Sequence, residues 1–269
     1  MVQFPHNTTP PHDGKAAVVE VKNKFLASRF ELKYVVSEEK ARAIKQYLLR
    51  FLDPDEYTDP EDNLGYAIHS LYLDSPDLKT CYSVIQGSKN RFKLRLRVYG
   101  KQDDPVFFEI KRRDNKVILK ERAIVHRSCT DELLEGRWSR PSDLVNGSDS
   151  QIRALSHFCE LRDLINAKPA AYVSYFREGY EPRESNRCRV TFDRRLRSGK
   201  YRETFNVADA VNWTDPKLPG VILELKFTDR FPLWMQDLVE WFDLSVQSVP
   251  KYVHCVALVH PEKMKRSDL

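Results

Sequence analysis

Charged and apolar residues alternate strictly in several short segments of the chain. The clearest segment covers residues 91–99 and has the sequence RFKLRLRVY. Successive side chains of a β-strand point to opposite faces, so this strand would separate four cations from its apolar residues: Arg91, Lys93, Arg95 and Arg97. Taken alone, the pattern favours an ordinary antiparallel strand with one solvated face.

The alternation recurs, and about eight strands are predicted. They cover residues 29–36, 66–73, 91–99, 106–113, 117–123, 171–178, 187–196 and 221–227. Seven of them carry charged residues on one face, most as pairs such as Glu-x-Lys, Lys-x-Arg or Arg-x-Arg. Their opposite faces are apolar and need a cover.

Three amphipathic helices are predicted, and they would cover the apolar faces of the strands. The first follows Ser37, a suitable N-cap, and ends before Asp53 and Pro54. The second covers residues 151–165 and the third residues 232–244. Shorter helical segments are expected at residues 74–78 and 131–136.

The pattern predicts an α+β fold built on an eight-stranded antiparallel β-barrel, flanked by α-helices. If the helices cover the apolar faces on the outside, the charged faces meet inside the barrel and form a tunnel with a charged lumen. Unpaired charges are costly to desolvate, so this tunnel should hold water and bind a polyanion.

Composition narrows the class of protein. The chain has 269 residues and 31% charged residues, yet its formal net charge is only +5. A protein that binds nucleic acid through nonspecific phosphate contacts usually has a stronger imbalance. No G-x-x-x-x-G-K-[ST] loop, zinc-ligand spacing or RNA-binding aromatic motif occurs, so a nucleic-acid partner is not expected.

The five Cys residues are scattered and include no C-x-x-C pair, which argues against a disulfide framework or a zinc site and favours a reducing compartment. No run approaches the roughly 20 apolar residues of a membrane span. We therefore expect a cytoplasmic protein without a membrane span, made of a disordered N-terminal arm (residues 1–24), a tunnel domain (residues 25–259) and a charged tail (residues 260–269).

The predicted lumen is rich in side chains that bind phosphate. Arg offers a bidentate fork to phosphate oxygens and Lys a point charge. An extended phosphate chain is the ligand that fits such a tunnel. The candidate phosphate-binding residues are Lys33, Arg95, Arg97, Lys111, Lys120, Arg122, Arg177, Arg189, Lys226 and Lys251.

Three carboxylates of the lumen, Glu31, Glu109 and Glu224, need a separate explanation because a carboxylate repels phosphate. A divalent metal that bridges carboxylate and phosphate is one explanation, and hard oxygen ligands suit Mg²⁺ or Mn²⁺. Pairing of each Glu with the Lys two residues later is the other. Both interpretations stay open for Glu31 and Glu109, whereas the metal is favoured for Glu224.

Together these motifs resemble the VTC domain, the polyphosphate polymerase branch of the triphosphate tunnel metalloenzymes. The resemblance runs in order from about residue 27 to 257. It implies an eight-stranded antiparallel tunnel that binds ATP or polyphosphate with a divalent metal, often Mn²⁺. The motifs are Glu31-Leu-Lys33-Tyr34, Arg95-Leu-Arg97-Val-Tyr-Gly100, Glu109-Ile-Lys111, Lys120-Glu-Arg122, Tyr175-Phe-Arg177, Arg189-Val-Thr-Phe-Asp193, Leu223-Glu224-Leu-Lys226 and Pro250-Lys251-Tyr252.

The resemblance also implies residue roles. Glu224 would bind the metal, and Lys251 would lie near the reacting phosphate, with Arg95, Arg97 and Lys226 as the other catalytic cations. The phosphate-binding positions would be Lys33, Arg95, Arg97, Lys111, Lys120, Arg177, Arg189 and Lys226.

Two features fall outside the family motifs. Pro250 stands where the family often has Ser, which removes a hydroxyl beside the reacting phosphate. Arg91 and Lys93 precede the Arg95-Leu-Arg97 motif, and we expect them nearer the tunnel mouth or outside the tunnel.

The function expected from this resemblance is that of a polyphosphate polymerase, which transfers the γ-phosphoryl group of ATP to a growing polyphosphate chain. Two alternatives remain open. One is a tunnel triphosphatase that hydrolyses inorganic triphosphate or a nucleoside triphosphate, and the other is a polyphosphate-binding module without catalysis. Polymer extension has little need of a strong general base, whereas hydrolysis needs an activated water.

Overall fold

The computed structural model describes residues 29–58, 65–99, 105–115, 117–183, 187–207 and 213–264. The disordered arm expected at residues 1–24 lies outside these ranges, as do residues 265–269 of the expected charged tail.

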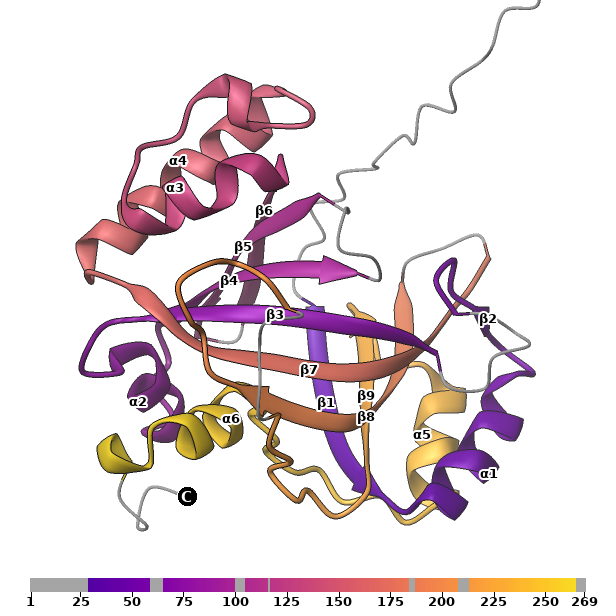
Figure 1. Cartoon of the computed structure of the whole chain (residues 1–269). Helices are drawn as coiled ribbons and strands as arrows, with labels where there is room; N and C mark the ends of the chain where they lie inside the picture. The colour runs from indigo at the N-terminus through magenta and orange to yellow at the C-terminus, as the bar shows by residue number, and fades with distance from the viewer. Residues whose placement is uncertain are drawn as a thin grey trace, which may run out of the picture.

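The described strands form one nine-stranded antiparallel sheet (Figure 1). Along the sheet the order is β1-β9-β8-β7-β3-β4-β5-β6, and the short β2 pairs with β7. The strands are β1 (Arg29–Val36), β2 (Asp53–Pro54), β3 (Tyr66–Asp74), β4 (Arg91–Tyr99), β5 (Val106–Asp114), β6 (Val117–Val125), β7 (Lys168–Glu181), β8 (Cys188–Gly199) and β9 (Val221–Thr228). The predicted α+β class and its eight main strands are confirmed.

The sheet curls so that its two ends approach each other. Glu31 on β1 lies 3.0 Å from the ammonium group of Lys111 on β5, although most of the sheet separates these strands in the hydrogen-bonding order. The curl brings the charged faces of distant strands together, as the alternation predicts.

The expected closed barrel is not confirmed. In the part of the chain that the structure describes, backbone pairing does not join β1 to β6. Instead, the carbonyl of Lys33 on β1 accepts a hydrogen bond from the backbone N–H of Gln247 (2.8 Å). A segment from the C-terminal half therefore pairs with the edge of β1 that a closed barrel would use.

Four helices cover the outside of the sheet. α1 (Glu38–Leu48) and α5 (Leu233–Trp241) pack on β1, β8 and β9, while α3 (Thr130–Glu135) and α4 (Asp149–Leu164) pack on β4, β5 and β6. α1 begins as predicted, because the Ser37 hydroxyl accepts from the N–H of Lys40 (3.1 Å). None of the described helices is long and apolar enough to cross a lipid bilayer.

The other two helices pack at one end of the curled sheet. α2 (Lys79–Ile85) and α6 (Lys251–Val259) share a buried apolar cluster with Ile68 and Tyr72 of β3 and with Val173 and Tyr175 of β7. Residues 68 and 72 alternate with Leu71, which belongs to the outer cluster. α6 therefore covers the inner face of the sheet, an arrangement that the prediction of outward-facing helices missed.

Candidate functional site

The inner face of the curled sheet gathers most of the predicted site residues. We call this group the charged interior, and it comprises Glu31, Lys33, Lys93, Arg95, Arg97, Glu109, Lys111, Lys120, Arg122, Arg177, Asp193, Glu224, Lys226 and Lys251. Its cations outnumber its carboxylates. Because apolar residues alternate with these charges along each strand, the opposite face of the same strands packs under the helices.

Glu109 on β5 is the first of two ion-pair centres in the charged interior. Arg95 on β4 and Arg122 on β6 lie directly opposite it in the two neighbouring strands. Their guanidinium groups reach its carboxylate at 2.7 and 2.6 Å, and Lys120 reaches it at 2.7 Å. Burial alone would raise the pKa of Glu109, but Lys120 and the neighbouring arginines outweigh burial and hold that pKa well below its usual range.

Glu224 on β9 is the second centre. Its carboxylate lies 2.6 Å from both Lys226 and Lys251, 3.4 Å from Arg177 and 3.7 Å from Lys33. Its side chain is only 4% exposed. These four cations outweigh the effect of burial and hold the pKa of Glu224 well below its usual range.

Asp193 on β8 belongs to the same centre, and sequence reasoning gave it no role. It accepts two hydrogen bonds from the guanidinium group of Arg177 (2.6 and 2.7 Å) and lies 2.6 Å from the ammonium group of Lys251. The alternation places Asp193 on the same face as Arg189, but it does not indicate that a helix supplies the third partner. Lys251 links Asp193 to Glu224.

Glu31 on β1 pairs with Lys33 at 3.1 Å and with Lys111 at 3.0 Å. Pairing of a Glu with the Lys two residues later thus occurs at Glu31 and Glu224. It does not occur at Glu109, since its expected partner Lys111 contacts Glu31 across the curl. Burial would raise the pKa of Glu31, whereas Lys111 and Lys33 lower it well below its usual range.

Tyrosines form a neutral part of the charged interior that the sequence analysis did not predict. Arg95 donates to the hydroxyl of Tyr72 (3.2 Å), and Arg97 donates to the hydroxyls of Tyr99 (3.4 Å) and Tyr175 (3.3 Å). These bonds aim the guanidinium groups without neutralising them. Glu109 is the carboxylate that these arginines share, and the tyrosine hydroxyls fill their remaining donor positions without adding another negative charge.

Arg189 is held apart from the other predicted phosphate-binding residues. Its backbone lies opposite Lys226 in the β8–β9 pairing. Its guanidinium group, however, pairs with the buried carboxylate of Asp55, just after β2, and donates to the hydroxyl of Tyr66 (3.3 Å). Gly179 leaves room for Asp55, since a Cβ atom there would lie 1.9 Å from a carboxylate oxygen of Asp55.

Arg91 and Lys93 were the two cations expected nearer the tunnel mouth or outside the tunnel. Arg91 donates to the carbonyl of Ser88, near the start of β4. Lys93 lies within the charged interior, where Lys33, Lys111 and Arg95 act on its ammonium group. Lys93 is therefore not outside the tunnel, and its partly exposed side chain agrees with the expected place near the mouth.

A family comparison fits this geometry. Residues 28–260 match the model of the VTC domain. The chain belongs to this family. The match covers nearly the whole chain and confirms the resemblance found in the motifs. No curated protein sequence matches the chain.

Two solved structures share low similarity with this VTC domain. A candidate adenylyl cyclase of Hippeastrum, described as having a dominant triphosphatase activity, aligns with a TM-score of 0.44 at 12% identity, over 90% of this chain and 98% of that chain. The Mediator head module of Schizosaccharomyces pombe aligns with a TM-score of 0.40 at 10% identity, over 82% of this chain and 98% of that chain. Neither likeness establishes a function.

The oxygen donors around Glu224 fit a hard divalent cation such as Mg²⁺ or Mn²⁺. No group of three or more His, Cys, Asp or Glu residues in the described ranges can hold a metal by itself. Mg²⁺, however, is often held by one or two carboxylates together with phosphate oxygens and water. Thr191 lies directly opposite Glu224, and its buried hydroxyl has no hydrogen-bond partner. Glu224 and this hydroxyl could therefore complete a phosphate-bound ion.

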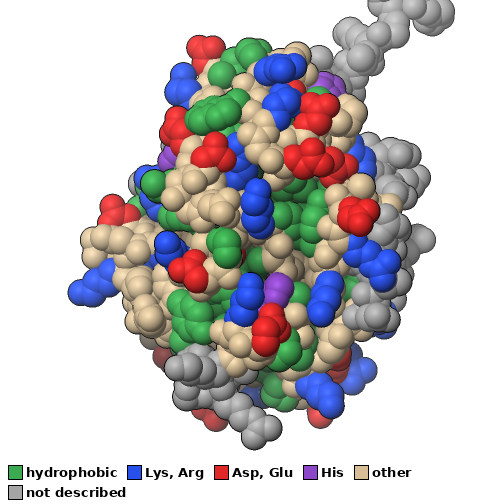
Figure 2. All heavy atoms as spheres, turned by 60° about the vertical axis from the view of Figure 1, so that its left-hand side comes forward, with side chains coloured by type: hydrophobic (Ala, Val, Ile, Leu, Met, Phe, Trp, Pro, Cys, Tyr) green, Lys and Arg blue, Asp and Glu red, His purple; other side chains and the backbone are tan. Residues whose placement is uncertain are grey.

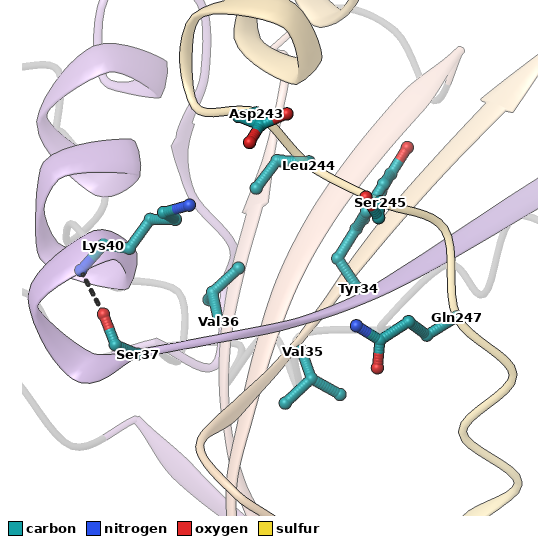
Figure 3. A pocket seen from close by; sticks show the side chains of 9 residues that line it. All are labelled: Tyr34, Val35, Val36, Ser37, Lys40, Asp243, Leu244, Ser245 and Gln247. Atoms are coloured by element: carbon teal, nitrogen blue, oxygen red, sulfur yellow. Dashed lines mark hydrogen bonds between the residues drawn. The ribbon is translucent and has the colours of Figure 1, made fainter.

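A separate pocket lies at the start of α1, between the end of β1 and the segment at residues 243–247 (Figure 3). Its volume is about 400 Å³. Its charged lining residues are Lys40 and Asp243, and the Lys40 ammonium group already donates to the carbonyl of Phe242 (2.8 Å). This pocket therefore lacks the cluster of cations that marks the charged interior.

One face of the outer surface of this VTC domain differs from the charged interior in how its charges are distributed. On the face that Figure 2 shows, Lys and Arg side chains are interspersed with Asp, Glu and apolar side chains. No continuous basic patch covers that face. The face in view therefore lacks the concentration of cations that the inner face of the sheet has.

Proposed function

We propose that this protein is a metal-dependent phosphotransferase that extends polyphosphate, transferring the γ-phosphoryl group of cytoplasmic ATP to the end of a polyphosphate chain bound in the charged interior. The observation that carries the proposal is the excess of Lys and Arg around Glu109 and Glu224, on strands that face one another. A buried excess of cations is costly unless an anion or water compensates it. A phosphate chain supplies the anion along the whole interior.

The cations would act on the charge that moves during transfer. Phosphoryl transfer passes through a loose transition state with negative charge on the peripheral oxygens, so alignment and charge stabilisation dominate catalysis. Arg95 and Arg97 are aimed by tyrosine hydroxyls and can hold phosphate oxygens. Lys251 lies at the first position of α6 and would hold the reacting phosphate.

A bound Mn²⁺ or Mg²⁺ would neutralise charge on the triphosphate oxygens. Glu224 is the residue that would hold it, with the Thr191 hydroxyl beside it. Lys226 and Lys251 occupy both oxygens of Glu224 in the protein alone. An incoming phosphate chain would attract these ammonium groups and so free the carboxylate.

The low pKa values of the carboxylates favour phosphoryl transfer to a phosphate chain over transfer to water. A general base for water works best with a pKa near the operating pH. Cations hold the pKa values of Glu31, Glu109 and Glu224 well below their usual range. The end of a polyphosphate chain is already anionic and needs no such base. Hydrolysis by a tunnel triphosphatase is the second candidate function.

Product balance distinguishes these functions. The protein would be incubated with ATP, Mn²⁺ and short polyphosphate, and ADP and free phosphate would be measured together. Polymer extension releases ADP without free phosphate, hydrolysis of ATP releases both in equal amounts, and hydrolysis of the short polyphosphate releases free phosphate without ADP. Binding of polyphosphate without release of either ADP or free phosphate would indicate a binding module and contradict the proposed enzyme.

Variants test the assigned site. Glu224→Gln should reduce ADP release, because the amide lacks the charge that holds a divalent cation. Lys79→Met is the matched control, since the Lys79 side chain is 64% exposed on α2, outside the charged interior. Full turnover by Glu224→Gln would contradict the assignment of the metal to this residue.

A further inference from the structure

Lys93 is distinguished from the other cations of the charged interior by its partners. Each of the others lies within 4.0 Å of a carboxylate oxygen. For Lys93, the described residues supply no carboxylate at that distance. Its ammonium nitrogen instead lies over the ring of Tyr252 on α6, 5.6 Å from the ring centroid.

The surroundings of Lys93 are cationic and aromatic. Lys111 lies directly opposite on β5, and Lys33 on β1 and Arg95 on β4 also act on the Lys93 ammonium group. Tyr72 on β3 stacks on Tyr252 with ring centroids 4.5 Å apart. Five elements of the fold, β1, β3, β4, β5 and α6, thus place residues around this ammonium group, and none of these residues is a carboxylate.

Such an environment is unfavourable for a lone cation. Burial, together with repulsion from Lys33, Lys111 and Arg95, lowers the pKa of Lys93 to about 8, although Tyr72 opposes this shift. The pKa of Tyr72 is also lowered to about 8, because the Arg95 and Lys93 charges outweigh its burial. Burial and the neighbouring cations thus outweigh the negative charge near Lys93, although Glu31 pairs with Lys33 and Lys111 close by.

The missing group must be a compact anion that can accept hydrogen bonds from several cations at once. A phosphate group meets this requirement, since its oxygens can contact Lys93, Lys111 and Arg95 together. The other cations must give up a carboxylate contact to bind phosphate, whereas Lys93 has none to give up. Lys93 should therefore contribute strongly to affinity.

We propose that Lys93 binds a phosphate group of the polyphosphate chain directly, in a subsite beside α6 that Lys33, Lys111 and Arg95 complete. This inference rests on the proposed function and adds a residue to it. The stacked rings of Tyr72 and Tyr252 border the subsite, with Tyr252 beneath the Lys93 ammonium group.

The test is calorimetric binding of inorganic tripolyphosphate to the full chain, without metal, for the wild type and for Lys93→Met. Met keeps most of the side-chain volume and removes the charge. The dissociation constant should rise about tenfold or more in Lys93→Met, as expected for loss of a charge-assisted hydrogen bond. The control Lys79→Met should bind as the wild type does.

A second measurement excludes an indirect structural effect. At pH 8 an amine with a pKa of about 8 is about half neutral, so phosphate binding should draw a proton onto Lys93. Binding heats in buffers of different ionisation enthalpy report this uptake. The wild type should take up protons at pH 8, and Lys93→Met should take up fewer.

The outcomes separate this inference from the function on which it rests. Equal affinity and equal proton uptake for the wild type and Lys93→Met would overturn the role of Lys93 while the proposed function stands. Absence of tripolyphosphate binding by the wild type would overturn both. Removal of an uncompensated charge should leave the melting temperature unchanged or higher, so Lys93→Met is expected to fold.

Discussion

The ammonium group of Lys251 lies 2.6 Å from Glu224 and 2.6 Å from Asp193. The two carboxylates stand on neighbouring strands, β9 and β8, and would repel each other without a cation between them. Lys251 is the first residue of α6, so the docking of this helix on the inner face sets the position of the cation. The helix and the ion-pair centre therefore depend on each other.

Replacing Lys251 with Met should reduce phosphoryl transfer. The proposed role is to stabilise charge on the reacting phosphate, and removal of one such group from an active site typically costs about 100-fold or more in kcat. Steady-state ADP release at saturating ATP measures the effect, with Lys79→Met as the control. Full kcat in Lys251→Met would contradict a catalytic role for this residue.

Replacing Glu109 with Gln should destabilise the fold. The amide leaves Arg95, Lys120 and Arg122 without a buried counter-charge, and breaking a buried ion pair of this kind costs about 3–5 kcal/mol. Urea unfolding measures the loss. Tripolyphosphate should raise the melting temperature of Glu109→Gln more than that of the wild type, because the anion replaces the lost charge. An equal shift in both proteins would argue against a phosphate site here.

Acid should weaken the fold through the same carboxylates. The folded-state pKa values of Glu109 and Asp193 are lowered, since their cationic partners outweigh burial. A depressed pKa contributes stability that is fully present above the unfolded-state pKa and is lost as the pH falls toward the folded-state pKa. The free energy of unfolding should therefore be level near pH 6–7 and fall progressively below about pH 5. Urea titrations at several pH values test this, and Glu109→Gln should show a weaker dependence.

Alkaline pH should weaken phosphate binding. Lys93 and Tyr72 both have pKa values of about 8 in the protein alone. A bound phosphate favours the ammonium form of Lys93 and the neutral form of Tyr72, so each group takes up a proton on binding above pH 8. The affinity for tripolyphosphate should thus be nearly constant below pH 7 and fall by up to about tenfold per pH unit for each proton taken up above pH 8. A constant affinity up to pH 10 would contradict this coupling.

The alternation of charge along the strands was sufficient to predict the sheet and the faces of its side chains. Glu31, Glu109 and Glu224 all lie on the inner face as predicted, because the side-chain period of a strand is two. The same alternation did not predict whether the sheet closes into a barrel. Alternation specifies faces and not edges, and it gave no indication that Gln247 would pair with the edge of β1.

The remaining differences between the prediction and the structure concern contacts between side chains that lie far apart in the sequence. The segment of α6 reads KYVHCVALV, which is rich in β-branched residues and lacks a polar face, so its helix forms through burial rather than through local preference. Without α6 in place, neither the depth of Lys93 nor the link from Lys251 to Asp193 could be predicted. The pairing of Asp55 with Arg189 likewise depends on the path of the chain after α1.

The size of the phosphate product tests the central claim most directly. The purified full chain would be incubated with ATP and Mn²⁺, and the products resolved on a polyacrylamide gel stained for polyphosphate. The proposed function predicts a polymer that lengthens with time and is absent from the Glu224→Gln reaction. ATP consumption that yields only free phosphate, with no polymer at any time, would contradict it.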